Sequence, residues 1–108
     1  MTRINVGETL LAIHLDELGV AFVDQFYYVP GRQFRADFGI PSHRLLIEVN
    51  GGRLMENSGH SGPTGIQRDN ERLNHATLHG WRLLRFTPQE VSSGAAKVWI
   101  QKVIEGKP

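Results

Sequence analysis

The sequence predicts an α/β sandwich in which helices cover a small mixed sheet, with the elements in the order α-β-β-β-α-β-α. Three observations support this prediction. Residues 7–18 and 66–79 carry apolar side chains at helical spacing, and each stretch is followed at once by a glycine, the residue that commonly ends a helix. Residues 34–52 have the pattern of two strands joined by a tight turn. An apolar strand at residues 81–86 then precedes a strong helix start at Thr87.

The central hairpin carries the first candidate site. Nearly every position in residues 45–49 is apolar, which predicts a central strand covered on both faces. Glu48 lies inside that run, and a buried glutamate is unfavourable unless something pairs with it. Asp37 occupies a similar place on the preceding strand, so the hairpin could bring the two carboxylates together. Because close carboxylates repel and a divalent cation makes their proximity favourable, the pattern predicts a metal site at Asp37 and Glu48.

The helices contribute two more candidate acids. Glu8 falls within the apolar stripe of the first helix, where it is either a carboxylate favoured by the helix N-terminus or an acid aimed at the sheet. Asp69 lies on the buried arc of the second helix and therefore needs a partner there. The pattern leaves open whether Asp69 forms an ion pair within the fold or serves a metal site.

The segments around the hairpin are assigned from their turn residues. Residues 26–29 read as the first strand, and a turn at Pro30 follows them. Residues 50–65 contain five glycines and one proline and are too polar and too interrupted for regular structure. Long loops of this kind are either disordered or functional, and this one carries Arg53 and His60.

The last helix is predicted to run from Thr87 to about residue 105. Glu90 stands three residues after Thr87, the spacing of a capping box. Gly94 is expected to weaken the middle of the helix. Trp99 belongs either to the core or to a partner-facing patch, and the core is favoured.

Length and composition indicate one domain over residues 1–108. The chain has no cysteine, so it has neither a disulfide framework nor a thiolate zinc site. No stretch has the length and apolar character of a membrane span or a signal peptide, and a cytoplasmic location is expected. The net charge is only +1, yet nine of the 12 basic residues are arginine. Arginine suits bidentate phosphate contacts, although solvated strand edges and helix faces would explain the composition equally well.

These residues together resemble the PD-(D/E)xK nuclease superfamily. The similarity is to its very-short-patch-repair-like branch and related small endonucleases with an E-D-x-H-D signature. The matching stretches are FRADFGIPSHRLLIEVNGG, GHSGPTGIQRDNERLN and HGWRLLRFTPQEV, which together cover roughly residues 34–91. The N-terminal helix with its glutamate also fits. The resemblance implies a restriction-endonuclease-like three-layer sandwich.

The same resemblance implies roles for five residues. Glu8 would be the acid on the first helix, and Asp37 would be the central metal ligand. Glu48 would stand at the acidic position of the next strand, His60 in the loop and Asp69 on the following helix. Many superfamily members have a lysine two residues after the strand glutamate, where this chain has Asn50. An amide cannot act as a cationic activator of water, so a loop histidine would have to take over proton transfer.

The implied chemistry is hydrolysis of a DNA phosphodiester bond. Asp37 and Glu48 would hold Mg²⁺, with Mn²⁺ as a substitute, and His60 would act as general base or acid at neutral pH. Four arginines are candidates to hold phosphates, namely Arg35, Arg53, Arg68 and Arg72.

Two other functions remain open at this point. One is a non-catalytic DNA- or protein-binding module on the same fold, and the other is a structure-selective junction resolvase that acts as a homodimer. Because the net charge is low, we expect a lone domain to bind duplex DNA weakly. Dimerisation or a targeting partner would compensate for this.

Overall fold

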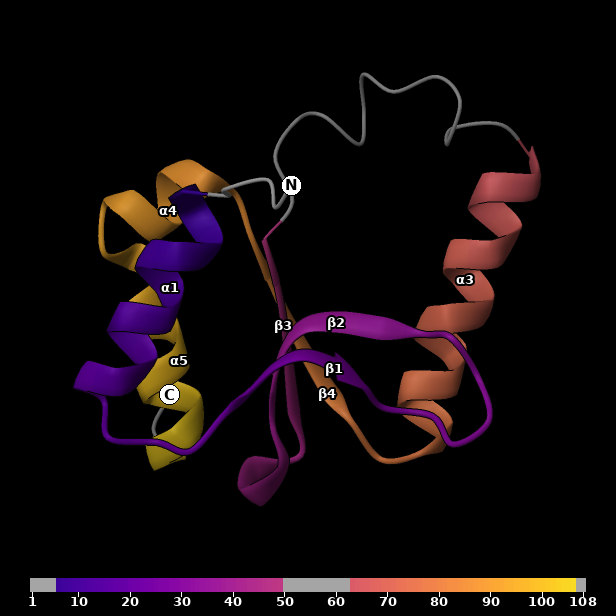
Figure 1. Ribbon diagram of the computed structural model, residues 1–108, viewed down its shortest axis with the longest axis horizontal. Helices are drawn as coiled ribbons and strands as arrows, with labels where there is room; N and C mark the ends of the chain where they lie inside the picture. The colour runs from indigo at the N-terminus through magenta and orange to yellow at the C-terminus, as the bar shows by residue number, and fades with distance from the viewer. Residues whose placement is uncertain (1–5, 50–62, 107–108) are drawn as a thin grey trace.

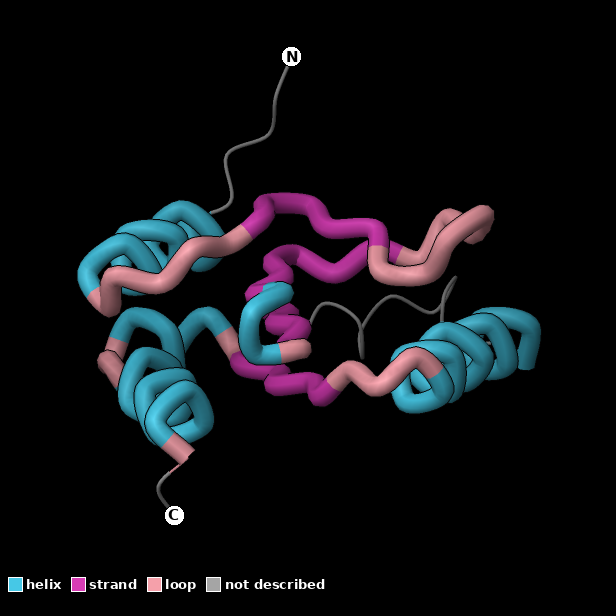
Figure 2. The backbone as a smooth tube through the Cα atoms, turned by 90° about the horizontal axis from the view of Figure 1, so that it is seen from below, coloured by secondary structure: helices cyan, strands magenta, loops and turns pink. Residues whose placement is uncertain are grey.

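The computed structural model describes residues 6–49 and 63–106. The elements are α1 (Val6–Glu17), β1 (Val23–Tyr27), β2 (Arg35–Ile40), η1 (Pro41–His43), β3 (Leu45–Val49), α3 (Pro63–Leu78), β4 (Arg82–Phe86), α4 (Pro88–Ser92) and α5 (Ala95–Glu105). Helices α1, α4 and α5 lie on one side of the sheet and α3 lies on the other (Figures 1 and 2). The predicted three-layer α/β sandwich is therefore confirmed.

The four strands form one mixed sheet in the order β1-β2-β3-β4. The first two pairs of neighbours are antiparallel, and β3 and β4 run parallel. Helix α3 connects these two parallel strands, and both of them end at the upper edge of the sheet in Figure 1. The first turn of α1 lies near that edge in the same view. This edge is therefore where the carboxyl ends of the parallel strands meet a helix N-terminus.

The sheet separates two apolar clusters. The larger cluster includes Leu11, Phe38, Ile47 and Ile100, and it fills the space between the sheet and helices α1, α4 and α5. The smaller cluster lies on the α3 side and contains Tyr28, Val29, Ala36, Leu46, Ala76 and Trp81. All five residues of β3 are buried, so the prediction of a central strand covered on both faces is confirmed.

The first strand begins earlier than predicted. It spans Val23–Tyr27, whereas the sequence indicated residues 26–29, because pairing with β2 continues back to Gly39. Gly39 is required at this point, since a Cβ there would overlap the ring of Phe26. Gln25 has a φ of 52°, an uncommon conformation for a residue with a side chain.

The C-terminal region differs from its prediction in two ways. Thr87 and Glu90 do form the capping box, but the helix ends at Ser92 and a new one begins at Ala95. The break falls at Gly94, whose φ of 89° cannot continue a right-handed helix. Trp99 is 54% exposed, so its assignment to the core was wrong. Its ring lies against the Lys102 ammonium group instead.

None of the helices in the described ranges is long and apolar enough to cross a membrane.

Candidate active site at the edge of the sheet

The strand register aligns four polar residues across the sheet. Phe38 pairs with Ile47, which puts Asp37 next to Glu48, and Glu48 pairs with Arg85 on β4. On the other side, the pairs that flank Asp37 bracket Gln25 of β1. We call Gln25, Asp37, Glu48 and Arg85 the polar row. It lies near the carboxyl ends of β3 and β4, the part of an α/β sheet where ligands generally bind.

Asp37 is partly buried in the row and is anchored by the backbone. The amide N–H of Val49 donates a hydrogen bond to its Oδ2 atom at 2.8 Å. Burial raises the pKa of the Asp37 carboxyl, and the negative charge of Glu48 raises it further. The Val49 amide and the charges of Arg35 and Arg72 oppose this shift. The net effect is a carboxylate whose charge is incompletely compensated.

Glu8 reaches the same region from the first turn of α1. Its Oε1 atom accepts a hydrogen bond from the side-chain amide of Gln25 at 3.3 Å. Burial raises the pKa of Glu8, and the next contributions are the charges of Asp37 and Asp24. Arg35 again acts in the opposite direction. The charge of Asp37 therefore disfavours the ionised form of Glu8, an electrostatic condition that a bound cation would relieve.

Glu48 has a different environment, because two arginines bind it directly. Its side chain is only 7% exposed. Arg72 pairs with both carboxylate oxygens, and Nη2 of Arg85 donates to Oε1 at 2.9 Å. The partner that the sequence required for a buried glutamate is thus present among the described residues, and it is cationic.

Arg72 links Glu48 to α3. It also donates to Oδ1 of Asp69 at 3.0 Å, so the predicted partner of Asp69 is an arginine one turn further along the helix. The Tyr28 hydroxyl donates to the backbone carbonyl of Arg72 at 3.2 Å. Burial alone would lower the pKa of Arg72, but hydrogen bonding and charge from Glu48 outweigh it and raise the pKa. Arg72 is therefore a permanently charged, internally paired group.

The structure brings Glu8, Asp37, Glu48 and Asp69 to one region of the molecule. Of the predicted phosphate-binding arginines, Arg35 is exposed and close enough to Glu8 and Asp37 to influence both. Arg72 is committed to its two carboxylates, as described above. Asn50, Arg53 and His60 lie outside the described residues.

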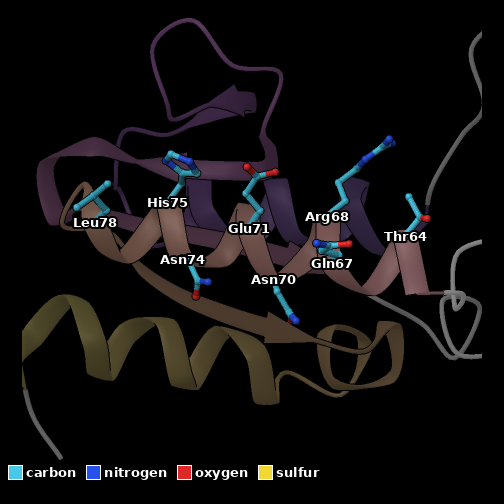
Figure 3. Close-up of a pocket in the computed structure, with 8 residues that line it drawn as sticks. All are labelled: Thr64, Gln67, Arg68, Asn70, Glu71, Asn74, His75 and Leu78. Atoms are coloured by element: carbon cyan, nitrogen blue, oxygen red, sulfur yellow. The ribbon is translucent and has the colours of Figure 1, made fainter.

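Arg68 is exposed on α3 beside a hollow of about 590 Å³. The described residues that line it all belong to this helix, namely Thr64, Gln67, Arg68, Asn70, Glu71, Asn74, His75 and Leu78. Asn70 and Asn74 project from one side of α3, whereas Arg68, Glu71 and His75 project from the other (Figure 3). Seven of these eight residues have polar side chains, with Leu78 as the exception, so the hollow differs from a pocket lined by hydrophobic and aromatic side chains.

Sequence reasoning missed Gln25 and Arg85. The signal for Arg85 was present, since Arg82, Leu84 and Phe86 alternate with Leu83 and Arg85 along one strand. This alternation does not, however, predict the parallel pairing of β3 and β4 that places Arg85 beside Glu48. Gln25 gave no such signal, because its role depends on an unusual backbone conformation next to Glu8.

The donor atoms in the described region form a pair and not a complete ligand set. Within residues 6–49 and 63–106, no three or more histidine, cysteine, aspartate or glutamate side chains are grouped so that they could hold a metal ion. Mg²⁺, however, usually binds through one or two carboxylates and keeps several waters. Glu8 and Asp37 bring two carboxylates to the same region, the number that such a site needs.

Comparison with known proteins identifies the fold. No family model matches the sequence, and the curated proteins give no match. Among solved structures, the chain is similar to the catalytic domain of the homing endonuclease I-Bth0305I, with a TM-score of 0.68. The likeness covers 93% of this chain and 94% of that one, at 21% sequence identity. The two chains share a fold. At this identity, the comparison supports the architecture of the whole chain and leaves the chemistry to the site residues.

Proposed function

We propose that this chain is a Mg²⁺-dependent DNA endonuclease of the PD-(D/E)xK superfamily, similar to its very-short-patch-repair-like branch. The observation that carries the proposal is the approach of Glu8 to Asp37 at the carboxyl edge of the sheet, where the charge of Asp37 raises the pKa of Glu8. The similarity in fold to a homing endonuclease catalytic domain supports it. The substrate would be DNA, reached by a dimer or with a targeting partner because the net charge is only +1.

Asp37 and Glu8 would hold the Mg²⁺ ion through their oxygens. When bound, Mg²⁺ would supply Lewis-acid stabilisation of the phosphate and a water of lowered pKa. Asp37 is suited to a fixed position because the Val49 amide anchors one of its oxygens. The sequence suggested Glu48 as the second ligand. Since both oxygens of Glu48 accept hydrogen bonds from arginine, we assign that position to Glu8.

The remaining steps require proton transfer and phosphate binding. His60 is the residue we propose as general base or acid, an assignment that rests on the sequence alone. Arg35 is an exposed cation near both acids, which suits it to hold the phosphate while the bond breaks. Arg68, which is exposed on α3, would contact the DNA backbone at a phosphate further from the cleaved bond.

The proposal is tested by cleavage of supercoiled plasmid, linear duplex and branched DNA in Mg²⁺, in Mn²⁺ and in EDTA. Asp37→Asn and Glu8→Gln should each reduce the rate at least about 100-fold, since several kcal/mol of charge stabilisation would be lost. Glu17→Gln is the matched control, because it makes the same change at the exposed far end of α1. Cleavage by Asp37→Asn at the wild-type rate would refute the assignment. Preference for branched over linear DNA would favour a junction resolvase.

Two observations favour a non-catalytic binding module as the second candidate. The strand glutamate is neutralised by arginines, and the described part of the chain holds no cluster of three metal-binding side chains. Such a module would bind DNA in a salt-dependent way without cutting it. Mn²⁺ binding, measured by electron paramagnetic resonance, separates the two functions. Only the nuclease should show Mn²⁺ binding that Asp37→Asn abolishes.

A further inference from the structure

The two arginines that bind Glu48 are not equivalent. Arg72 has a side chain only 18% exposed and divides its donors between Glu48 and Asp69. The Arg85 side chain is 38% exposed, and among the described residues its one hydrogen bond goes from Nη2 to Glu48. A guanidinium carries five N–H donors in a rigid fork, so Arg85 keeps most of its donors for another acceptor. Glu48 holds the Arg85 side chain in place, but most of the N–H donors of Arg85 are not used by that contact.

The position of Arg85 in the polar row indicates where an acceptor for its remaining N–H donors would lie. Asp37, Glu48 and Arg85 lie on three neighbouring strands, so the Asp37 and Arg85 backbones are about 10 Å apart, two strand spacings. The row is acidic around Asp37, where Glu8 joins it, and basic at the Arg85 end. Glu48 lies between them with its charge fully engaged. Acidic side chains and a basic side chain with uncommitted donors therefore adjoin each other along one edge of the sheet.

We propose that Arg85 contacts a DNA phosphate next to the one held at Asp37, and that Glu48 is a positioning residue for Arg85 and not a metal ligand. The proposal rests on the function proposed above, since it takes DNA as the ligand. Glu48 fixes the guanidinium before DNA arrives, which reduces the side-chain entropy lost on binding. Arg72 supplies a second positive charge, which offsets the cost of burying the Glu48 carboxylate.

The phosphate contact is tested by the salt dependence of DNA binding, measured by fluorescence anisotropy without metal so that no cleavage occurs. Arg85→Gln should reduce the slope of log K against log salt by about one unit, and to the same extent for unrelated duplex sequences. Arg82→Gln is the matched control, because Arg82 is exposed on the same strand but donates to His43 near the opposite edge. Arg85→Lys should restore most of the slope. Equal slopes for Arg85→Gln and Arg82→Gln would overturn the proposal, as would a wild-type protein that does not bind DNA.

The positioning role is tested with Glu48→Gln, whose folding is checked by circular dichroism. Glu48→Gln should bind Mn²⁺ as the wild type does, whereas Asp37→Asn should not. Its DNA affinity should fall, and adding Arg85→Gln should lower it little further, because both changes remove the same contact. Loss of Mn²⁺ binding in Glu48→Gln would make Glu48 a ligand and overturn the proposal. If Glu48→Gln does not fold, the Arg85 variants still decide the phosphate contact.

These readouts are independent of catalysis. A wild type that binds DNA with the expected Arg85 dependence but never cleaves it would refute the nuclease function and leave the phosphate contact supported. A wild type that cleaves DNA, together with an Arg85→Gln variant whose DNA binding is unchanged, would support the nuclease function and refute the phosphate contact.

Discussion

Truncation of Glu48 should be the most destabilising change at the site. The Glu48 side chain is only 7% exposed, and its carboxylate pairs with Arg72 and Arg85. Glu48→Ala removes that carboxylate and leaves both guanidinium groups without this partner. Removing one partner of a buried ion pair typically costs 3–5 kcal/mol. The lower end, about 3 kcal/mol, applies here because Arg72 keeps Asp69 and Arg85 can turn to water. For a domain of this size the melting temperature should fall by about 12 °C.

The assay is thermal and urea unfolding in EDTA at pH 7, with Glu71→Ala as the matched control. Glu71 is also a carboxylate paired with an arginine, Arg32, but at 3.8 Å with side chains 53% and 48% exposed. Exposed pairs contribute at most about 1 kcal/mol, so Glu71→Ala should be nearly neutral. If Glu48→Ala costs no more than Glu71→Ala, the ion pairs at Glu48 do not stabilise the fold.

Two further predictions concern the carboxylates and the hairpin. Asp37→Asn should stabilise the metal-free protein at pH 7, because the raised pKa of Asp37 means that its ionised form is disfavoured in the folded state. This gain in stability should vanish as the pH falls toward the ordinary carboxyl pKa of 3.8. Melting temperatures measured across this pH range would contradict the prediction if the gain grew on acidification. Gly39→Ala should lower the free energy of unfolding by about 1–3 kcal/mol, because the new methyl group overlaps Phe26, whose ring is held edge-on against Trp81. Adding Phe26→Leu should restore part of this stability. A melting temperature of Gly39→Ala equal to that of the wild type would refute the steric argument.

The site shows how far residue patterns reach. A buried glutamate in an apolar strand had to have a partner, and the sequence predicted a metal ion for it. For Asp69 the sequence left an ion pair or a metal site open. The structure supplies arginine for both Glu48 and Asp69. The choice depended on the register of two strands that are distant in sequence, β3 and β4, and on the position of α3. No local spacing contains that information.

Periodicity, turn residues and capping signals by themselves determined the order of elements up to the last strand, the hairpin, the buried central strand and the Thr87 capping box. These are local properties, in which each residue's preference depends on a few neighbours along the chain. Only the tertiary structure decided that Gly94 divides the last helix, that Trp99 is exposed, and that Glu8 approaches Asp37 while Glu48 is held by Arg72 and Arg85. Those outcomes depend on which surfaces the packed layers leave uncovered and on charges that only folding brings together.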